Sequence, residues 1–235
     1  MGDRMFGITR RGNTMKIFIG AADSADNKSM AVALRRKRFQ FFLSLLDATP
    51  KPCRILDVGG RESYWRSMGY MGAPDVQIIL LNLKDVETTT PYISGMVGDA
   101  TNMPQFANGE FDIVYSNSVI EHLFNEDAQR RMAAEVMRVG KRHFIQTPNR
   151  YFPIEPHFHM PFFQFMPLPM QTYLLTHMAL GNLGRRIADP EEAKRIALEI
   201  RLLSKRQFQR LFPDSKIYTE ALYGLAKSYI AYGGW

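Results

Sequence analysis

The sequence has little cysteine and no long apolar run. Its single cysteine, Cys53, excludes an intramolecular disulfide framework and a cysteine-built zinc site, which favours a reducing compartment. No apolar stretch reaches the roughly 18 residues that a transmembrane helix needs. After the basic residues near the start comes only the short apolar run Ile17-Phe18-Ile19, too brief for the core of a secretory signal. We expect a cytoplasmic protein, with contact at a membrane surface as an open alternative, and an inert, packed Cys53.

The chain also lacks repeats and low-complexity tracts, and its charge has a modest excess of one sign. Its 235 residues are 46% hydrophobic, enough for one sizeable core, and carry a net charge of +7. That charge is compatible with nucleic acid, an anionic membrane face or acidic substrates. Four of the basic residues, Arg35, Arg36, Lys37 and Arg38, follow one another in a predicted helix over 29–46. They indicate either an anion-binding face or, as we favour, a solvated helix surface.

From Pro52 onward short β-rich runs alternate with helical stretches, which predicts an α/β fold with a doubly wound, mostly parallel sheet. Two closing strands pair as an antiparallel hairpin, so the sheet has seven strands. A further short strand is predicted at Met15 to Ile19. The expected strands of the sheet are 54–58, 76–83, 93–97, 111–116, 143–147, 216–222 and 226–232, and the expected helices 62–68, 125–138, 190–203 and 204–211.

The segment after Pro148 is rich in Phe, Met and Pro and predicts an inserted α-helical cap at about 150–203. Its prolines break any long helix before about Met170. We therefore expect an N-terminal arm and helix over 1–50, and a single domain over 51–235 that includes the cap. The apolar side chains indicate a lid over an apolar acceptor, a surface at a membrane interface beside Arg185-Arg186, or packing against the sheet or a second copy.

The first predicted strand of the sheet runs into Gly59-Gly60 and then into a helix. Glycines let the backbone approach a ligand closely, and the amides at a helix start are hydrogen-bond donors. A dinucleotide fingerprint needs G-x-G-x-x-G and a phosphate-binding loop needs G-x-x-x-x-G-K-[ST], and the sequence has neither. The turn therefore predicts a site for something other than a pyrophosphate. Arg61 follows the glycine pair, and Trp65, on the next helix, either packs on the sheet, as we favour, or covers a ligand.

Four motifs in order resemble the class I S-adenosylmethionine-dependent methyltransferases. They are Leu56-Asp57-Val58-Gly59-Gly60, the strand Ile78 to Leu83, Gly98-Asp99-Ala100, and Phe111-Asp112-Ile113-Val114-Tyr115-Ser116-Asn117-Ser118-Val119-Ile120-Glu121-His122-Leu123. The resemblance spans 52–147, and the runs 146–150 and 152–157 are similar to a bacterial subgroup of unassigned substrate. It implies a Rossmann-like methyltransferase fold with S-adenosylmethionine as cofactor.

The resemblance also implies roles at the strand ends. Asp57 and the glycine turn would surround the amino-acid end of the cofactor. Asn82 stands where the family usually has an acidic residue for the ribose hydroxyls, and Asp85 or Glu87 are alternatives for that role. Asp99 would accept a hydrogen bond from the adenine amino group, and the backbone amide of Ala100 would donate one to the adenine ring. Asn117 and Ser118 would lie near the transferred methyl group. The residues that the resemblance assigns to the cofactor are thus Asp57, Gly59, Gly60, Asn82, Asp99, Ala100, Asn117 and Ser118.

Five further residues are candidates for acceptor chemistry. Glu155, His157 and His159 alternate, so on an extended segment they share a face. They could bind a metal, line an acceptor pocket with a histidine as general base, or hydrogen-bond the backbone of the cap. We favour the last two alternatives and predict no metal. The resemblance places the pair Glu121-His122 near the methyl-transfer region. The candidate bases are His122, His157 and His159, and the candidate acceptor-binding residues are Glu121, Glu155 and His157.

Together these patterns predict methyl transfer from S-adenosylmethionine to a small-molecule or lipid-like acceptor. A non-catalytic cofactor-binding or scaffold protein on the same fold is the first alternative. A nucleic-acid methyltransferase is the second; it is disfavoured because the chain has no Asn/Asp-Pro-Pro-aromatic motif and its basic residues are dispersed. The oligomeric state is left open.

Overall fold

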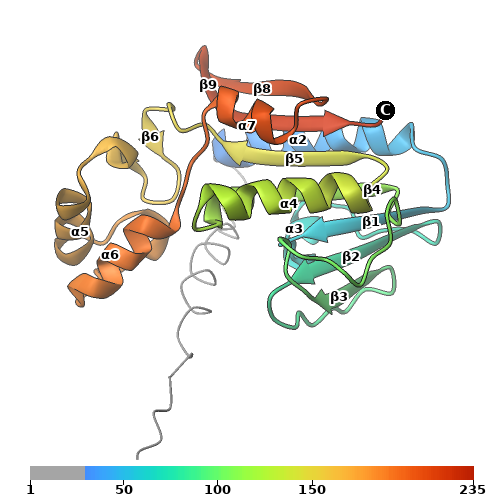
Figure 1. Ribbon diagram of the computed structural model, residues 1–235, viewed down its shortest axis with the longest axis horizontal. Helices are drawn as coiled ribbons and strands as arrows, with labels where there is room; N and C mark the ends of the chain where they lie inside the picture. Colours follow the sequence, from blue (N-terminus) through green and yellow to red (C-terminus); the bar gives the residue numbers. More distant parts are fainter. Residues whose placement is uncertain (1–29) are drawn as a thin grey trace, which may run out of the picture. The chain divides into compact units, whose positions relative to one another are not determined.

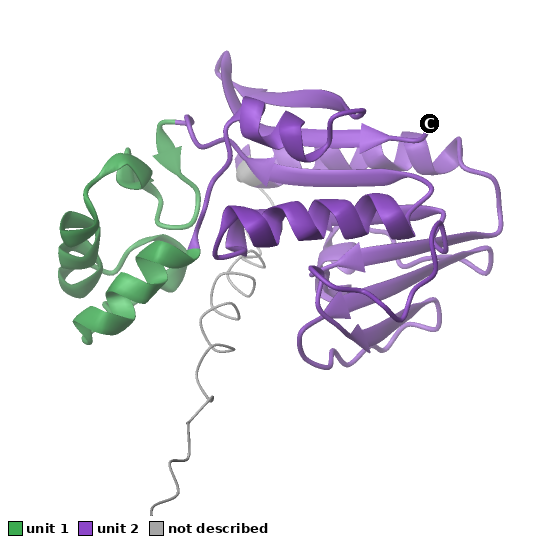
Figure 2. Ribbon diagram, in the orientation of Figure 1, with its two compact units in different colours: residues 1–24, 153–199 green, residues 25–152, 200–235 purple. Residues whose placement is uncertain are grey.

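The computed structural model describes residues 30–235. This part of the chain forms two compact units, one of residues 153–199 and the other of residues 30–152 and 200–235 (Figure 2). The predicted strand at Met15 to Ile19 lies outside the described residues. The proposed division of the chain at residue 50 stays a prediction.

The larger unit contains a seven-stranded sheet with the order β3-β2-β1-β4-β5-β9-β8 (Figure 1). The first five strands pair in parallel, while β9 runs antiparallel to both β5 and β8. The predicted doubly wound sheet with a closing hairpin is therefore confirmed. The strands are β1 (Cys53–Val58), β2 (Val76–Asn82), β3 (Ile93–Val97), β4 (Ile113–Asn117), β5 (His143–Pro148), β8 (Lys216–Leu222) and β9 (Leu225–Gly233).

Helices cover both faces of this sheet. On one face, α4 (Glu126–Val139) and α7 (Lys205–Leu211) pack on one core cluster, and on the other, α2 (Met30–Asp47) and α3 (Glu62–Ser67) pack on a second. The side chain of Asn125 caps α4 by accepting a hydrogen bond from the Ala128 amide, a role for which asparagine is preferred. Trp65 is fully buried in the second cluster, so its packing role is confirmed. The Cys53 thiol is buried in the same cluster, and burial raises its pKa to about 11.

The order of the strands creates a crevice at their carboxyl ends. β1 and β4 are parallel neighbours, but the chain continues from β1 toward β2 and from β4 toward β5, on opposite sides. Ligands of open α/β sheets bind outside the carboxyl ends of the strands at this reversal. The carboxyl ends of β1, β2 and β4, together with the segments that follow β1, β3 and β4, carry the predicted cofactor residues.

The smaller unit holds short elements with many exposed apolar side chains. They are β6 (Ile154–Glu155), β7 (Met160–Pro161), α5 (Leu168–His177) and α6 (Pro190–Glu199), with 3₁₀ turns at Phe163–Phe165 and Gly181–Leu183. α5 begins earlier than predicted because Pro169 lies in its first turn, where a proline needs no amide partner. The predicted helix over 190–203 ends at Glu199, and the chain then leaves this unit. No helix within residues 30–235 is both long and apolar enough to span a bilayer.

Both chain segments that connect to residues 153–199 are tied together inside the larger unit. Asn149 and Leu203 form a parallel bridge, and the Arg150 amide donates to the Leu203 carbonyl at 3.0 Å. The side-chain amide of Asn149 also donates to the Ala226 carbonyl, at 2.7 Å. The insertion therefore starts and ends at one place beside β5 and β9.

Candidate functional site

The turn after β1 is packed so tightly that it requires both glycines. Gly59 has a φ of +74°, and its amide donates to the Leu81 carbonyl at 2.8 Å. A Cβ on Gly59 would lie 2.6 Å from a methyl carbon of Val119, and one on Gly60 would lie 1.7 Å from Oδ2 of Asp57. The backbone of the turn thus rests directly on the Asp57 carboxylate, just before the start of α3.

Replacing Gly60 by alanine is expected to abolish binding of S-adenosylmethionine, because the new Cβ displaces either the turn or the Asp57 carboxylate. Calorimetric titration of the ligand measures the loss. Gly69→Ala is the control: nothing lies within 4 Å of its added Cβ, and Gly69 differs from Gly60 in having a positive φ of +77°. It keeps the ligand affinity while losing about 1 kcal/mol of stability. Equal affinities for Gly60→Ala and the wild type would show that the turn does not hold the ligand.

Asp57 is the buried acid beneath this turn. Its side chain is 1% exposed, and Nε1 of Trp65 donates to Oδ2 at 2.7 Å. Burial raises the pKa of Asp57 to about 7, although the hydrogen bond from Trp65 acts in the opposite direction. Trp65 is itself fixed by edge contacts with Phe39 and by Tyr115, whose ring centres lie 5.6 and 5.3 Å away. An ammonium group placed near the turn would stabilise the ionised form of this acid.

Asn82, at the end of β2, joins the same turn. Its Nδ2 donates to the Gly60 carbonyl at 2.9 Å. A carboxylate at this position has no hydrogen to donate, so the asparagine has a structural reason to replace the usual acid. Its Oδ1 has no hydrogen-bond partner among residues 30–235 and remains available as an acceptor. The alternatives Asp85 and Glu87 are exposed on the following loop, and one oxygen of Asp85 accepts from the Val86 amide.

Asp99 follows β3 and is held by its own loop. Its Oδ1 accepts from both the amide and the hydroxyl of Thr101, each at 2.8 Å. Asp99 is exposed, and its second oxygen has no partner within residues 30–235. Ala100 is half-buried and packs against the first core cluster. This geometry leaves one carboxylate oxygen, in a fixed orientation, to accept a hydrogen bond.

The end of β4 contains a buried ion pair that the sequence pattern did not indicate. Arg38 of α2 donates from Nη1 to Oδ1 of Asn117, while its Nε and Nη2 donate to Glu220 of β8 at 3.0 and 2.7 Å. Arg38 is 8% exposed and Glu220 is 5% exposed, and the Ser228 hydroxyl also donates to Glu220. Burial alone would lower the pKa of Arg38, but the Glu220 carboxylate raises it.

The favoured expectation of a solvated basic face is therefore wrong for Arg38. Arg36 and Lys37 are exposed, as expected for that face. Arg38 precedes the buried Phe42 by four residues and Leu46 by eight, so all three lie along one side of α2. This spacing was the signal that could have identified Arg38 as buried.

Ser118 and Gln146 tie β4 to β5 at the same edge. Ser118 has a φ of +57°, which is costly for a residue with a side chain. Its amide donates to the Gln146 carbonyl at 3.1 Å, and its hydroxyl donates to the side-chain oxygen of Gln146 at 2.8 Å. These two bonds hold the strained residue between Asn117 and the buried 3₁₀ turn Ile120–His122.

That 3₁₀ turn carries the predicted pair Glu121-His122, and both side chains are buried. The Thr147 hydroxyl donates to Oε2 of Glu121 at 3.1 Å, and the Glu121 carbonyl accepts from the Arg201 amide at 2.7 Å. The pair is thus built into the larger unit beside the end of β5. Its role in acceptor binding or proton transfer stays a prediction.

The predicted common face of Glu155, His157 and His159 is wrong, because the chain turns after Glu155. The His159 amide donates to the Glu155 carbonyl at 2.9 Å, and His159 is exposed with a φ of +52°. Glu155 and His157 are both buried, with Nδ1 of His157 2.7 Å from Oε1 of Glu155. Oε2 of Glu155 accepts from the amides of His157 and Phe158, each at 2.7 Å. The structure brings Glu155 and His157 together and leaves His159 apart.

Known proteins resemble this chain in one sequence segment and in fold. Residues 76–143 match the family model described as a methyltransferase domain. In fold, the chain is similar to a carbon methyltransferase of CurJ, with a TM-score of 0.57 and 8% identity over 94% of this chain and 60% of that one. A SAM-dependent methyltransferase from Aquifex aeolicus gives a TM-score of 0.50 and 11% identity over 91% of this chain and 95% of that one. Residues 76–143 thus resemble a methyltransferase domain in sequence, and the chain shares the fold of these methyltransferases.

Two sequence relatives come from Mycobacterium tuberculosis. The uncharacterized proteins MT1557 and Rv1509 are each 35% identical over 74 residues, which are 32% of this chain and 25% of theirs. The aligned segment thus spans a quarter of the length of these relatives. The family match agrees with the predicted resemblance to methyltransferases over residues 76–143. It leaves the acceptor open.

Proposed function

We propose that this methyltransferase domain transfers a methyl group from S-adenosylmethionine to a small-molecule acceptor with an apolar part. The observation that carries the proposal is the turn over Asp57: the Gly60 backbone rests on a buried acid and is held from the other side by Asn82. Such a turn offers amides to a carboxylate and a buried acid to an ammonium, which are the two charged groups at the amino-acid end of this cofactor.

The remaining cofactor contacts follow from the hydrogen-bond acceptors at the ends of the strands. Oδ1 of Asn82 would accept from a ribose hydroxyl, and the second oxygen of Asp99 from the adenine amino group, beside the Ala100 amide. Asn117 and Ser118 would flank the methyl group. When bound, S-adenosylmethionine supplies a methyl group already activated by its sulfonium. The protein then has to align the acceptor, exclude water and, for a hydroxyl or amine acceptor, take up a proton.

The candidate proton acceptors have different surroundings. His122 is buried in the larger unit, next to Glu121. In the smaller unit, Nδ1 of His157 lies 2.7 Å from Oε1 of Glu155, which fixes the orientation of the ring and favours a hydrogen on Nδ1. His159 is exposed. The proposal keeps all three as candidates, with Glu121, Glu155 and His157 as candidate acceptor contacts.

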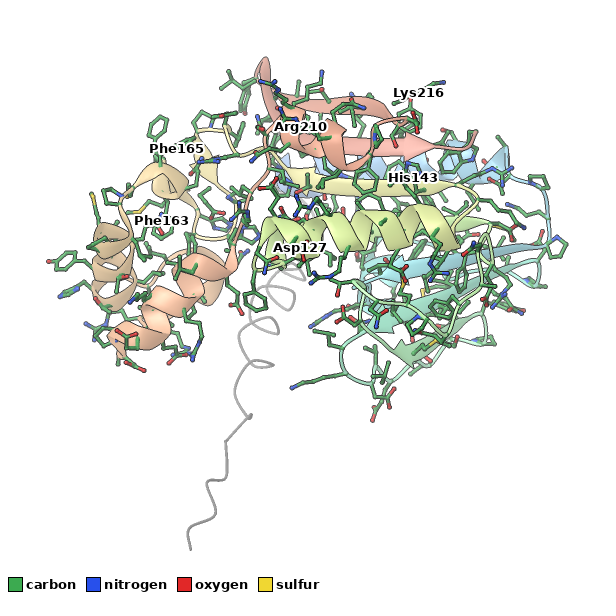
Figure 3. All side chains as sticks on the ribbon, in the orientation of Figure 1. Asp127, His143, Phe163, Phe165, Arg210 and Lys216 are labelled. Carbon is green, nitrogen blue, oxygen red and sulfur yellow. The ribbon has the colours of Figure 1, made fainter. Side chains whose placement is uncertain are left out.

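The apolar part of the proposed acceptor is supported by the surface of the smaller unit. Phe162, Phe165, Met170, Tyr173 and Met178 are all exposed there, and Figure 3 marks Phe165. A groove of about 560 Å³ between α5 and α6 is lined by Leu168, Pro169, Thr172, Tyr173, Thr176, Pro190 and Lys194. An aliphatic chain or ring is the chemistry that such a lining accepts. Contact with a membrane surface, with Arg185 and Arg186 facing anionic head groups, is the second form of the proposal.

Calorimetric titration with S-adenosylmethionine tests the proposed cofactor site. Asp99→Ala is expected to weaken binding roughly tenfold, because it removes a charged hydrogen-bond acceptor. The matched control is Asp214→Ala, which changes an exposed aspartate of the same unit and keeps the affinity. No binding by the wild type, or an unchanged affinity in Asp99→Ala, would remove the basis of the proposal. Binding without turnover on any acceptor would favour the non-catalytic alternative.

A further inference from the structure

The hairpin β8–β9 contains a bulge at Lys227. Glu220 pairs with Ser228 and the next residue, Ala221, pairs with Ala226, which leaves Lys227 as an extra residue in β9. A bulge bends its strand and redirects a side chain, and bulges are frequent next to active sites. The strictly alternating pattern of a regular strand would place Lys227 and Ser228 on opposite faces; the extra residue removes that constraint.

Lys227 lies at the sheet edge that carries the candidate site. Ser228 pairs with Pro148, the last residue of β5, and the Asn149 amide donates to the Lys227 carbonyl at 2.9 Å. β4 and β5 are parallel neighbours, so their carboxyl ends, with Asn117 and Pro148, meet at this edge. Figure 1 shows the hairpin turn on the same side of the sheet as the end of β5.

The charges around Lys227 are not balanced within the described residues. Arg38 and Ser228 both donate to Glu220, so this one carboxylate is already engaged. The half-buried ammonium of Lys227 has no hydrogen-bond or ion-pair partner among residues 30–235. Burial lowers the pKa of Lys227, the charges of Arg38 and Arg35 lower it further, and Glu220 partly offsets them. An anion at this place would relieve the repulsion and the cost of burial.

We propose that Lys227 binds an oxyanion of the acceptor, a carboxylate or a phosphate, at the carboxyl end of β5. This rests on the proposed methyl transfer and specifies its substrate class: a molecule with an anionic group as well as an apolar part. The positive charges of Arg38 and Arg35 act on Lys227, and the opposing carboxylate of Glu220 is already bonded to Arg38. The bulge frees Lys227 from the regular alternation of β9. The anion anchors the acceptor, while the methyl group is transferred to a different atom of it.

Calorimetry on the protein saturated with S-adenosylhomocysteine tests the proposal, with inorganic phosphate and acetate as separate probes. We expect the wild type to bind at least one probe, and the preferred probe distinguishes a phosphate from a carboxylate. Lys227→Met is expected to weaken that binding roughly tenfold or more, whereas Lys227→Arg retains it. Lys216→Met is the matched control, because Lys216 is an exposed lysine at the opposite end of the same hairpin (Figure 3). It keeps the wild-type affinity.

Each outcome separates the anion site from the cofactor site. If the wild type fails to bind S-adenosylhomocysteine, the proposed function fails. If it binds that product but neither probe, or if the Met variants at 227 and 216 weaken the probe equally, the lysine site is overturned and any binding reflects the general positive charge. Unchanged affinity for S-adenosylhomocysteine and an unchanged melting temperature show that Lys227→Met is folded.

Discussion

Replacing Arg38 by methionine is expected to lower the free energy of unfolding by about 3–5 kcal/mol. The substitution keeps the apolar stem but leaves the carboxylate of Glu220 buried without its cation. It also removes the donor that holds Asn117 at the end of β4. Urea unfolding followed by circular dichroism measures the loss. The same variant is expected to bind S-adenosylmethionine more weakly, because Asn117 loses its fixed orientation.

A double-mutant cycle separates the ion pair from general damage to the core. Glu220→Gln in the Arg38→Met background removes the uncompensated charge, so the double variant is expected to be more stable than Arg38→Met alone. Arg36→Met is the matched control on the same helix: Arg36 is exposed, and its replacement changes stability by at most about 0.5 kcal/mol. Additive losses in the double variant would contradict a coupled buried pair.

Replacing Asp57 by asparagine is expected to stabilise the ligand-free protein and to weaken its binding of S-adenosylmethionine. The folded-state pKa of Asp57, about 7, lies above its ordinary value of 3.8. The folded protein therefore binds the proton more tightly than the unfolded chain does, and wild-type stability falls as the pH rises from about 4 to about 7. Asparagine cannot ionise, so the variant gains on the order of 1–4 kcal/mol at pH 8. The cost is the loss of the negative partner for the cofactor ammonium.

Thermal unfolding and calorimetry between pH 4 and pH 8 test both parts of this expectation. The difference in melting temperature between Asp57→Asn and the wild type should widen up to about pH 7 and then level off. Wild-type affinity for S-adenosylmethionine should rise over the same range, and the affinity of the variant should stay flat and lower. Asp47→Asn, at an exposed position in α2, leaves both measurements at wild-type values. A variant that is less stable than the wild type at pH 8 would contradict the raised pKa of Asp57.

The sheet, and the position of the candidate cofactor residues at its strand ends, could be predicted from the sequence because their signals are local. Strands buried on both faces appear as short apolar runs, and the motif residues follow them directly, as Asp99 follows β3. The cap on α4 was equally readable, since Asn125 needs only the amide of a residue three positions later. In these cases neighbours in the chain determine the structure.

The contacts around Arg38, Lys227 and Glu155 could not be predicted because they depend on hydrogen bonds and strand register that no local pattern indicates. The partners Arg38 and Glu220 are 182 residues apart, and no pattern near either residue indicates the other. The bulge at Lys227 depends on the register of two strands. The turn after Glu155 is set by amides that bond to its carboxylate, whereas the alternation of Glu155, His157 and His159 predicted an extended segment.

The bridge between Asn149 and Leu203 has a consequence for how such a protein can diverge. The chain leaves the larger unit and re-enters it at hydrogen-bonded neighbours, so residues 153–199 begin and end at a single point. Insertions, deletions or a wholly different sequence between these ends would leave the pairing of β5 with β9 in place. Relatives could therefore differ throughout this segment while keeping the glycine turn after β1 and the hairpin β8–β9.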